Sequence, residues 1–435
     1  MPKTITFRQG LSSVLFWSVI SAAFIGPGTV TTASSAGAAH DLSLLWALLF
    51  STIATILLQE AAARITIASG RNLGEIIALK YGGNKKLRLS LFVAVAFGCA
   101  AYQTGNILGA LQGLRFIIFD IPNYALAIGI AFVSFSILWG GNISFIAKAL
   151  GAVVAFMGIA FCWVALTADI NWVDFIKAAV LPSFPPGASL LIIGLIGTTI
   201  VPYNLFLASG IGKGQHIFEM RIGIALAVLI GGIISAAILV TGTQVEGTYS
   251  YEALVGAMTE KLGSWAVGLF GFGLFAAGMS SAITAPLAAA ITGQSLLGNQ
   301  ATWHEKSMAF RLSWGIILLI GLGFSLLNIR PIPAIILAQA INGVLLPIVA
   351  VFLILAVNDR RLMPESFINT RASNLVMLLI VGITCYLGLT NIWKAVENVL
   401  PIIKEGQLLT QWLNLFLSIA ITSWVGFSIF RKQKA

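Results

Sequence analysis

Two short segments interrupt long apolar stretches of this chain and concentrate neutral polar residues. The first reads Gly26-Pro27-Gly28, and Thr29 follows it at the start of a Thr- and Ser-rich run. Proline lacks a backbone N–H and glycine adopts backbone angles that other residues avoid, so an unwound point in a helix is predicted here. We expect a new helix near Thr29, whose opening N–H groups and positive dipole end favour an anion or a strongly polar group.

The second interruption lies in the segment GLIGTTIVPYNLFLAS. Thr199 and Val201 precede Pro202, and Tyr203 and Asn204 follow it. Interrupted helices at corresponding positions of two halves are the best sequence indication of the binding site of an inverted-repeat transporter. The two breaks together predict a central substrate site that contains Gly26, Gly28, Thr29, Thr199, Val201, Tyr203 and Asn204.

Further polar side chains occur in otherwise apolar segments that lie outside the breaks. Burying an amide without a hydrogen-bond partner is costly, so we expect Gln103, Asn106, Gln339 and Asn342 to line the same cavity. Ser280, Ser281 and Thr284 lie on one helix and have the oxygens to ligate a coupling ion such as Na⁺. The alternative for these three is that their hydroxyls bond back to their own helix.

The composition indicates the elements that must position these residues. Of 435 residues, 58% are hydrophobic and 9% are charged, and the mean hydropathy is +0.96. Such a chain is an all-α, multi-pass membrane protein. Twelve helices are predicted, near 13–39, 43–69, 88–113, 124–141, 146–168, 187–212, 220–243, 264–290, 310–327, 334–356, 373–390 and 408–430. We expect residues 1–185 and 186–358 to form two inverted repeats of five helices, and 359–435 to add two peripheral helices.

The cationic residues behind the net charge of +10 are distributed unevenly over the connections between helices. Nineteen of the 25 Lys and Arg residues fall on one set of alternate connections and the termini. The other set holds Arg115, Lys177, Lys261, Arg330, Lys394 and Lys404. The positive-inside rule then puts both termini in the cytoplasm, in the plasma (inner) membrane. The basicity is explained by topology, and no nucleic-acid partner is expected.

The order of several motifs resembles the natural-resistance-associated macrophage protein (NRAMP) family. These motifs are GPGTVTTASSAGAAHDLSLLW, LQEAAARITIASGRNLGE, GTTIVPYNLFLAS, LFAAGMSSAITAP and LAQAINGVLLP with NDRRLMP. The resemblance covers roughly residues 12–364. It implies a LeuT-type fold and the secondary transport of metal ions by alternating access.

The chain departs from the family at the positions that the resemblance assigns to metal binding. Gly26 and Thr29 replace the Asp and Asn of the family's first break, and Val201 replaces the Met of the second. Tyr203 and Ala208 stand at positions of family histidines, and Gln103 and Asn106 align with an acidic pair implicated in proton transfer. Every change removes a charge or a soft ligand, so no metal site of the family's type is expected.

Three functions compete. The first is a transporter of a small anion or a polar solute, which suits a neutral cavity at a helix start. The second is a transporter of a divalent cation, of the Mg²⁺ or Mn²⁺ class, held partly through water. The third is a membrane sensor that no longer transports. We expect no enzyme activity and no cofactor, because no carboxylate pair or nucleophile triad lies within reach. The expected partners are a small solute or ion and the lipid bilayer, with no protein partner evident.

Overall fold

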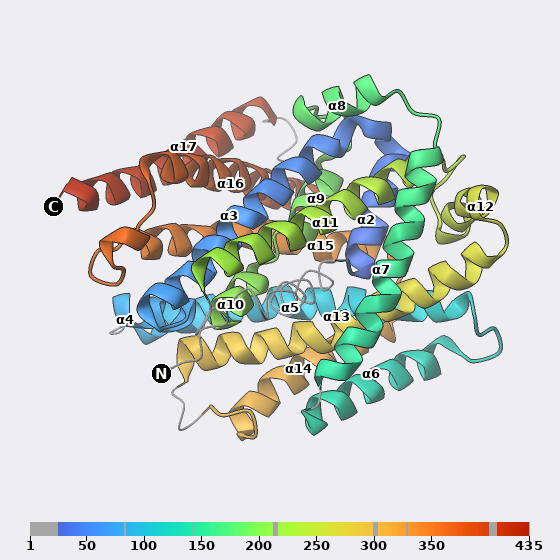
Figure 1. Cartoon of the computed structure of the whole chain (residues 1–435), viewed down its shortest axis with the longest axis horizontal. Helices are drawn as coiled ribbons and strands as arrows, with labels where there is room; N and C mark the ends of the chain where they lie inside the picture. The colour runs from blue at the N-terminus through green and yellow to red at the C-terminus, as the bar shows by residue number, and fades with distance from the viewer. Residues whose placement is uncertain are drawn as a thin grey trace.

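The computed structural model describes residues 25–81, 84–141, 143–211, 216–298, 303–327, 329–399 and 407–434. The first half of the predicted broken helix, residues 13–24, lies outside these ranges. Within them the chain is helical, and Figure 1 shows the main helices packed into one bundle. They are α2 (Pro27–His40), α3 (Leu45–Ser69), α5 (Lys85–Arg115), α6 (Asn123–Gly140), α7 (Ile143–Thr167), α9 (Ser189–Thr199), α10 (Pro202–Ile211), α11 (Ile217–Thr243), α13 (Trp265–Leu297), α14 (Met308–Ser325), α15 (Pro331–Val357), α16 (Arg371–Val399) and α17 (Gln407–Lys434).

The predicted helix count agrees with this arrangement. Eleven segments of the described chain are long and apolar enough to cross a membrane. One of them, Pro27–Ser69, joins α2 to α3 through the short 3₁₀ helix η2 (Asp41–Leu44) and so includes parts of two predicted helices. Another, Ser189–Gly210, includes both α9 and α10 and carries the second break.

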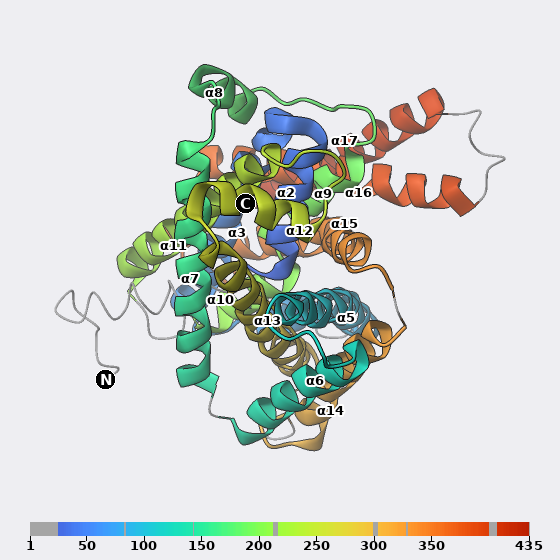
Figure 2. The same ribbon diagram turned by 90° about the vertical axis from the view of Figure 1, so that its right-hand side faces the viewer.

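The longest helices form the centre of the molecule. Helices α5 and α13 pack along each other, and α15 packs against both α5 and α9. Four further contacts form two matching pairs. Helix α3 packs on α10 and α11 packs on α2, while α5 packs on α14 and α13 packs on α6. Figure 2 shows α16 and α17 projecting to one side of this bundle.

Close backbone approach fixes the position of α2. A Cβ atom on Gly37 of α2 would lie 2.0 Å from the Leu239 carbonyl oxygen of α11, and one on Gly242 would lie 2.2 Å from the Ser34 carbonyl oxygen. Only glycine fits at these two points, because any side chain would force the helices apart. The second half of the first broken helix is therefore held tightly against α11.

Three short helices were not predicted. They are α4 (Leu73–Lys80), α8 (Trp172–Val180) and α12 (Tyr251–Leu262). Helix α12 occupies most of the segment from Gln244 to Gly263, which connects α11 to α13. Each short helix begins at a side-chain cap, formed by Asn72, Asn171 and Ser250 respectively. These caps satisfy N–H groups that a short helix otherwise leaves unpaired, and they were the available sequence signal.

The two ends of the bundle differ in charge. At the end that bears α4, Lys80 pairs with Asp359 at 3.0 Å, and Arg64 and Arg221 both pair with Glu60, at 3.0 and 2.9 Å. Glu60 and Arg64 lie four residues apart and so pair across one helical turn. At the opposite end lie α8, α12 and the first turn of α9 (Figure 1). We refer to these as the α4 end and the α12 end.

Candidate functional site: the two helix breaks

The first break is a helix start inside the bundle. Gly26 is extended, with φ −93° and ψ 177°, and α2 begins at Pro27, two residues earlier than expected. Proline fits the first helical position because the N–H it lacks has no partner there. The Val30 N–H donates to the Gly26 carbonyl at 3.2 Å, and no side chain caps the helix. The Gly28 N–H therefore lies ahead of the first intrahelical bond and points out of the helix start.

The second break separates α9 from α10. Helix α9 ends at Thr199, Ile200 leaves the helical region with φ −98° and ψ 85°, and α10 begins at Pro202. The Asn204 N–H donates to the Val201 carbonyl at 3.0 Å and closes the new turn. Val201, Tyr203 and Asn204 are all buried. The predicted position of this break is confirmed to within two residues.

The two breaks meet. The Thr29 and Thr198 hydroxyls lie 3.0 Å apart and form a hydrogen bond between α2 and α9. On α5, the Tyr102 hydroxyl donates to the Gly197 carbonyl at 2.6 Å, and its ring makes an edge contact with that of Tyr203, with centroids 5.8 Å apart. Segments far apart in sequence thus converge on one neutral, hydroxyl-rich site.

Gln339 of α15 lies between the breaks. A Cβ atom on Gly28 would lie 2.1 Å from Gln339 Nε2, and one on Gly197 would lie 2.1 Å from the Gln339 backbone oxygen. The Oε1 atom of Gln339 is buried and has no hydrogen-bond partner. A buried acceptor without a partner is costly, and such atoms mark places where a ligand or water completes the bonding.

Ser281 is the predicted coupling-ion residue that adjoins the first break. Its Oγ lies 3.1 Å from the position that a Cβ on Gly26 would take. The Thr284 hydroxyl instead donates back to the Ser280 carbonyl at 3.2 Å, as the structural alternative predicts.

The remaining predicted amides contact neighbouring helices. Gln103 Nε2 donates to the Ala282 carbonyl at 3.0 Å, and Asn342 Nδ2 donates to the Gly98 carbonyl at 3.1 Å. Thr199 donates back to the Leu195 carbonyl at 3.0 Å. Asn106 is buried and its Nδ2 has no partner. The structure thus brings Gly26, Gly28, Thr29, Gln339 and Ser281 together, whereas Gln103 and Asn342 use their N–H groups to join helices.

Helix α11 also faces the breaks, which the sequence did not indicate. A cavity of about 10 Å³, the space of one water-sized sphere, lies between Thr29, Thr198 and Thr199 and four residues of α11. Those residues are Val228, Gly231, Gly232 and Ser235. The Gly231-Gly232 pair was the one available signal, since adjacent glycines in a span permit close approach. This cavity between Thr29, α9 and α11 has room for about one water molecule.

The site carries no concentration of metal ligands. Among the residues that the structure describes, no group of three or more His, Cys, Asp or Glu side chains is placed to hold a metal ion. The three cysteines are free, with Cys99 and Cys385 buried and Cys162 half-buried. What the breaks offer is backbone N–H and carbonyl groups, hydroxyls and amides, which bind polar groups of either sign only weakly without further charge.

Comparisons with known proteins define the class of protein. The family model described as natural resistance-associated macrophage protein-like matches residues 18–394, so the chain belongs to the Nramp family. It is a multi-pass membrane transporter of that family and not an enzyme.

The individual relatives agree. The divalent metal cation transporter MntH of Bacillus subtilis is 28% identical over 405 residues, covering 87% of this chain and 92% of the relative. MntH of Verminephrobacter eiseniae is 26% identical over 365 residues, covering 78% and 81%. A mutant of the Eremococcus coleocola manganese transporter superposes with a TM-score of 0.75 at 19% identity, covering 99% and 97%. The nucleobase-cation-symport transporter Mhp1 superposes with a TM-score of 0.52 at 16% identity, covering 96% and 92%. These likenesses confirm the expected LeuT-type fold.

Proposed function

We propose that this chain is a secondary transporter that works by alternating access and carries a small anion or a polar solute. The observation that carries the proposal is the uncharged helix start at Gly26-Pro27-Gly28, beside the partnerless oxygen of Gln339. The Gly28 N–H and the dipole of α2 favour a negative or strongly polar group. The Gln339 oxygen can only accept, so it would take a hydrogen bond from an O–H or N–H group of the same cargo. Asn204 and Tyr203 would contact the cargo from the second break.

The relatives support a second candidate. The similar proteins of Bacillus subtilis and Verminephrobacter eiseniae are named divalent metal cation transporters. A hydrated Mg²⁺ ion can be held through its own water by neutral oxygens, such as those of Thr29, Thr198 and Gln339. Either candidate requires the cavity between Thr29, α9 and α11 to widen, because this cavity fits only one water-sized sphere.

The membrane arrangement belongs to the same proposal. We infer that residues 1–185 and 186–358 are the two repeats that move against each other, and that 359–435 remain peripheral. The α4 end, rich in Lys and Arg, would face the cytoplasm together with both termini, in the plasma membrane. Helices α2 and α9 are in contact near the α12 end. In this orientation the structure corresponds to a state of the transporter whose site is closed on the outer side of the membrane.

A charge placed at Gly26 separates the candidates. In Gly26→Asp the new carboxylate stands at the N-cap of α2, next to Ser281 and within reach of the Gly28 N–H, in a low dielectric where repulsion of an anion is strong. Flux of an anion into proteoliposomes should fall at least about tenfold, which is about 1.4 kcal/mol. Flux of a divalent cation should be unchanged or increased.

The matched control is Gly26→Asn, which has the same shape without the charge. A preceding screen of small carboxylates, bicarbonate, polar solutes, Mg²⁺ and Mn²⁺ in liposomes identifies the flux to be measured. Faster transport of the identified cargo in Gly26→Asp would reject the anion proposal. Flux of none of these solutes by the folded protein would reject the transporter proposal in favour of a sensor.

A further inference from the structure

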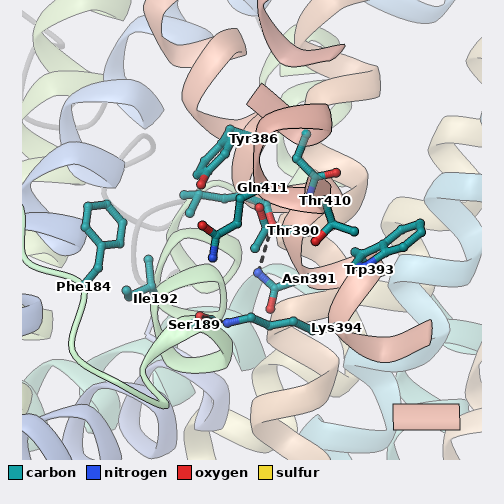
Figure 3. Close-up of a pocket in the computed structure, with 12 residues that line it drawn as sticks. Phe184, Ser189, Ile192, Tyr386, Thr390, Asn391, Trp393, Lys394, Thr410 and Gln411 are labelled. Carbon is teal, nitrogen blue, oxygen red and sulfur yellow. Dashed lines mark hydrogen bonds between the residues drawn. The ribbon is translucent and has the colours of Figure 1, made fainter. Parts of the chain in front are cut away.

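A second cavity lies far from the breaks, at the α12 end between α9, α16 and α17. Its volume is about 360 Å³, and Figure 3 shows polar side chains from all three helices around it. Lys394 and Asn391 come from α16, Gln411 and Thr410 from α17, and Ser189 from the first turn of α9. Lys394 is one of six cationic residues in the connections predicted to be outside, so a cation here is uncommon for this face.

The cavity is rich in hydrogen-bond donors. The Lys394 ammonium donates to the Ser189 hydroxyl, which holds the lysine across the cavity mouth from α16 to α9 (Figure 3). The Trp393 Nε1 and Thr390 Oγ1 atoms are buried and have no hydrogen-bond partner. The indole nitrogen can only donate, so its missing partner is an acceptor. None of the described residues that line the cavity is Asp or Glu.

An apolar groove adjoins this polar cavity. The groove has a volume of about 610 Å³ and shares Phe184, Tyr386 and Leu387 with the cavity. It continues between the membrane-spanning parts of α16 and α17, along Leu378, Ile383 and Leu415. A donor-rich, cationic compartment joined to an apolar channel matches an amphiphile with an anionic head and a hydrocarbon chain.

We propose that this composite site binds an anionic phospholipid. Its phosphate accepts from Lys394, Trp393 and Thr390, and one acyl chain lies in the groove between α16 and α17. The surrounding bilayer supplies the ligand, and the exposed leucines at the groove edge open directly to it. Because Ser189 opens α9, the bound lipid contacts the outer half of the second broken helix.

The test measures lipid binding to the purified full-length protein by native mass spectrometry and by thermal unfolding. The probes are micelles containing phosphatidylglycerol, micelles containing phosphatidylcholine, and inorganic phosphate without lipid. We expect phosphatidylglycerol to remain bound and to raise the apparent Tm more than phosphatidylcholine does. Lys394→Gln should weaken phosphatidylglycerol binding at least about fivefold, the effect of one cation near an anionic head group.

Matched variants separate the head-group cavity from the groove. Lys177→Gln removes another exposed cation of the same end and should leave binding unchanged. Leu415→Trp fills the groove with Lys394 intact and should reduce binding, whereas Leu229→Trp, at an exposed leucine of α11, should not. Equal stabilisation by both lipids, or a Lys394-dependent stabilisation by inorganic phosphate alone, would overturn the proposal. So would unchanged lipid binding in both Lys394→Gln and Leu415→Trp.

Discussion

At the scale of single residues, the centre of this transporter is built from neutral groups that bond to one another. The Thr29–Thr198 hydroxyl pair joins α2 to α9, close in sequence to Gly26 and Val201, where the resemblance to the family would place a carboxylate and a thioether. Hydroxyls both donate and accept, so the pair satisfies itself without a bound ion.

Metal binding should therefore be weak until ligands are restored. We expect Mn²⁺ to bind the native protein no tighter than about 1 mM, or roughly 4 kcal/mol. In Gly26→Asp combined with Val201→Met, a carboxylate and a thioether return to the two breaks, and weak transition-metal binding should appear in calorimetry. The native protein is the control. Micromolar affinity in the native protein, or no gain in a folded double variant, would contradict this account of the ligands.

At the scale of helices, the position of α2 depends on backbone contact with α11. Gly37→Ala places a methyl group 2.0 Å from the Leu239 carbonyl oxygen, which belongs to a backbone and cannot move aside alone. We expect this variant to lower the free energy of unfolding by about 1–3 kcal/mol, the usual cost of overpacking. Thermal unfolding in detergent measures the change. Gly129→Ala on α6 has open space around its methyl group and should leave the Tm unchanged or slightly higher.

Two tyrosines, the first residue of α12 and one just before its cap, contact α2. The Tyr251 hydroxyl lies 2.6 Å from that of Thr31, and the Tyr249 hydroxyl lies 2.6 Å from that of Ser34. In Tyr249→Phe with Tyr251→Phe, we expect faster hydrogen exchange of the backbone of α2, with that of α6 unchanged. Equal exchange of α2 in the double variant and the native protein would mean that packing alone holds it.

The same contact has a defined dependence on pH. Burial raises the pKa of Tyr249 and of Tyr251 above the ordinary value of 10.0. A raised pKa favours the neutral phenol in the folded protein, so the stabilisation is fully present below pH 10 and is lost as the pH rises through the raised pKa. The contact should be constant over physiological pH, in contrast to a switch based on histidine.

At the scale of the whole molecule, the charge asymmetry predicts one orientation in the membrane. With Cys99, Cys162 and Cys385 replaced by alanine, Lys261→Cys on α12 should react with an impermeant maleimide added to intact cells. Arg71→Cys, exposed beside α4, should react only after the membrane is opened. The reverse pattern would invert the topology, and with it the assignment of the closed side.

The sequence by itself determined the class of fold, because the signals for it are local. A span needs about 20 apolar residues, and a proline followed by polar residues within a glycine-rich apolar stretch indicates an interruption, so the spans and the two predicted breaks at Pro27 and Pro202 follow from composition and order. The short helices α4, α8 and α12 were not predicted. Each depends on a single cap, at Asn72, Asn171 and Ser250 respectively, and not on a long apolar period.

Only the tertiary structure decided which polar residues share the site. Periodicity placed Gln103, Asn342 and Gln339 alike inside spans, yet the first two bond to neighbouring helices and only Gln339 lies against Gly28. That difference depends on rotation about each helix axis, which is set by packing at contacts such as Gly37 against α11. The composite cavity between α9, α16 and α17 was likewise invisible in the sequence, because Ser189, Lys394 and Gln411 come from three separate helices.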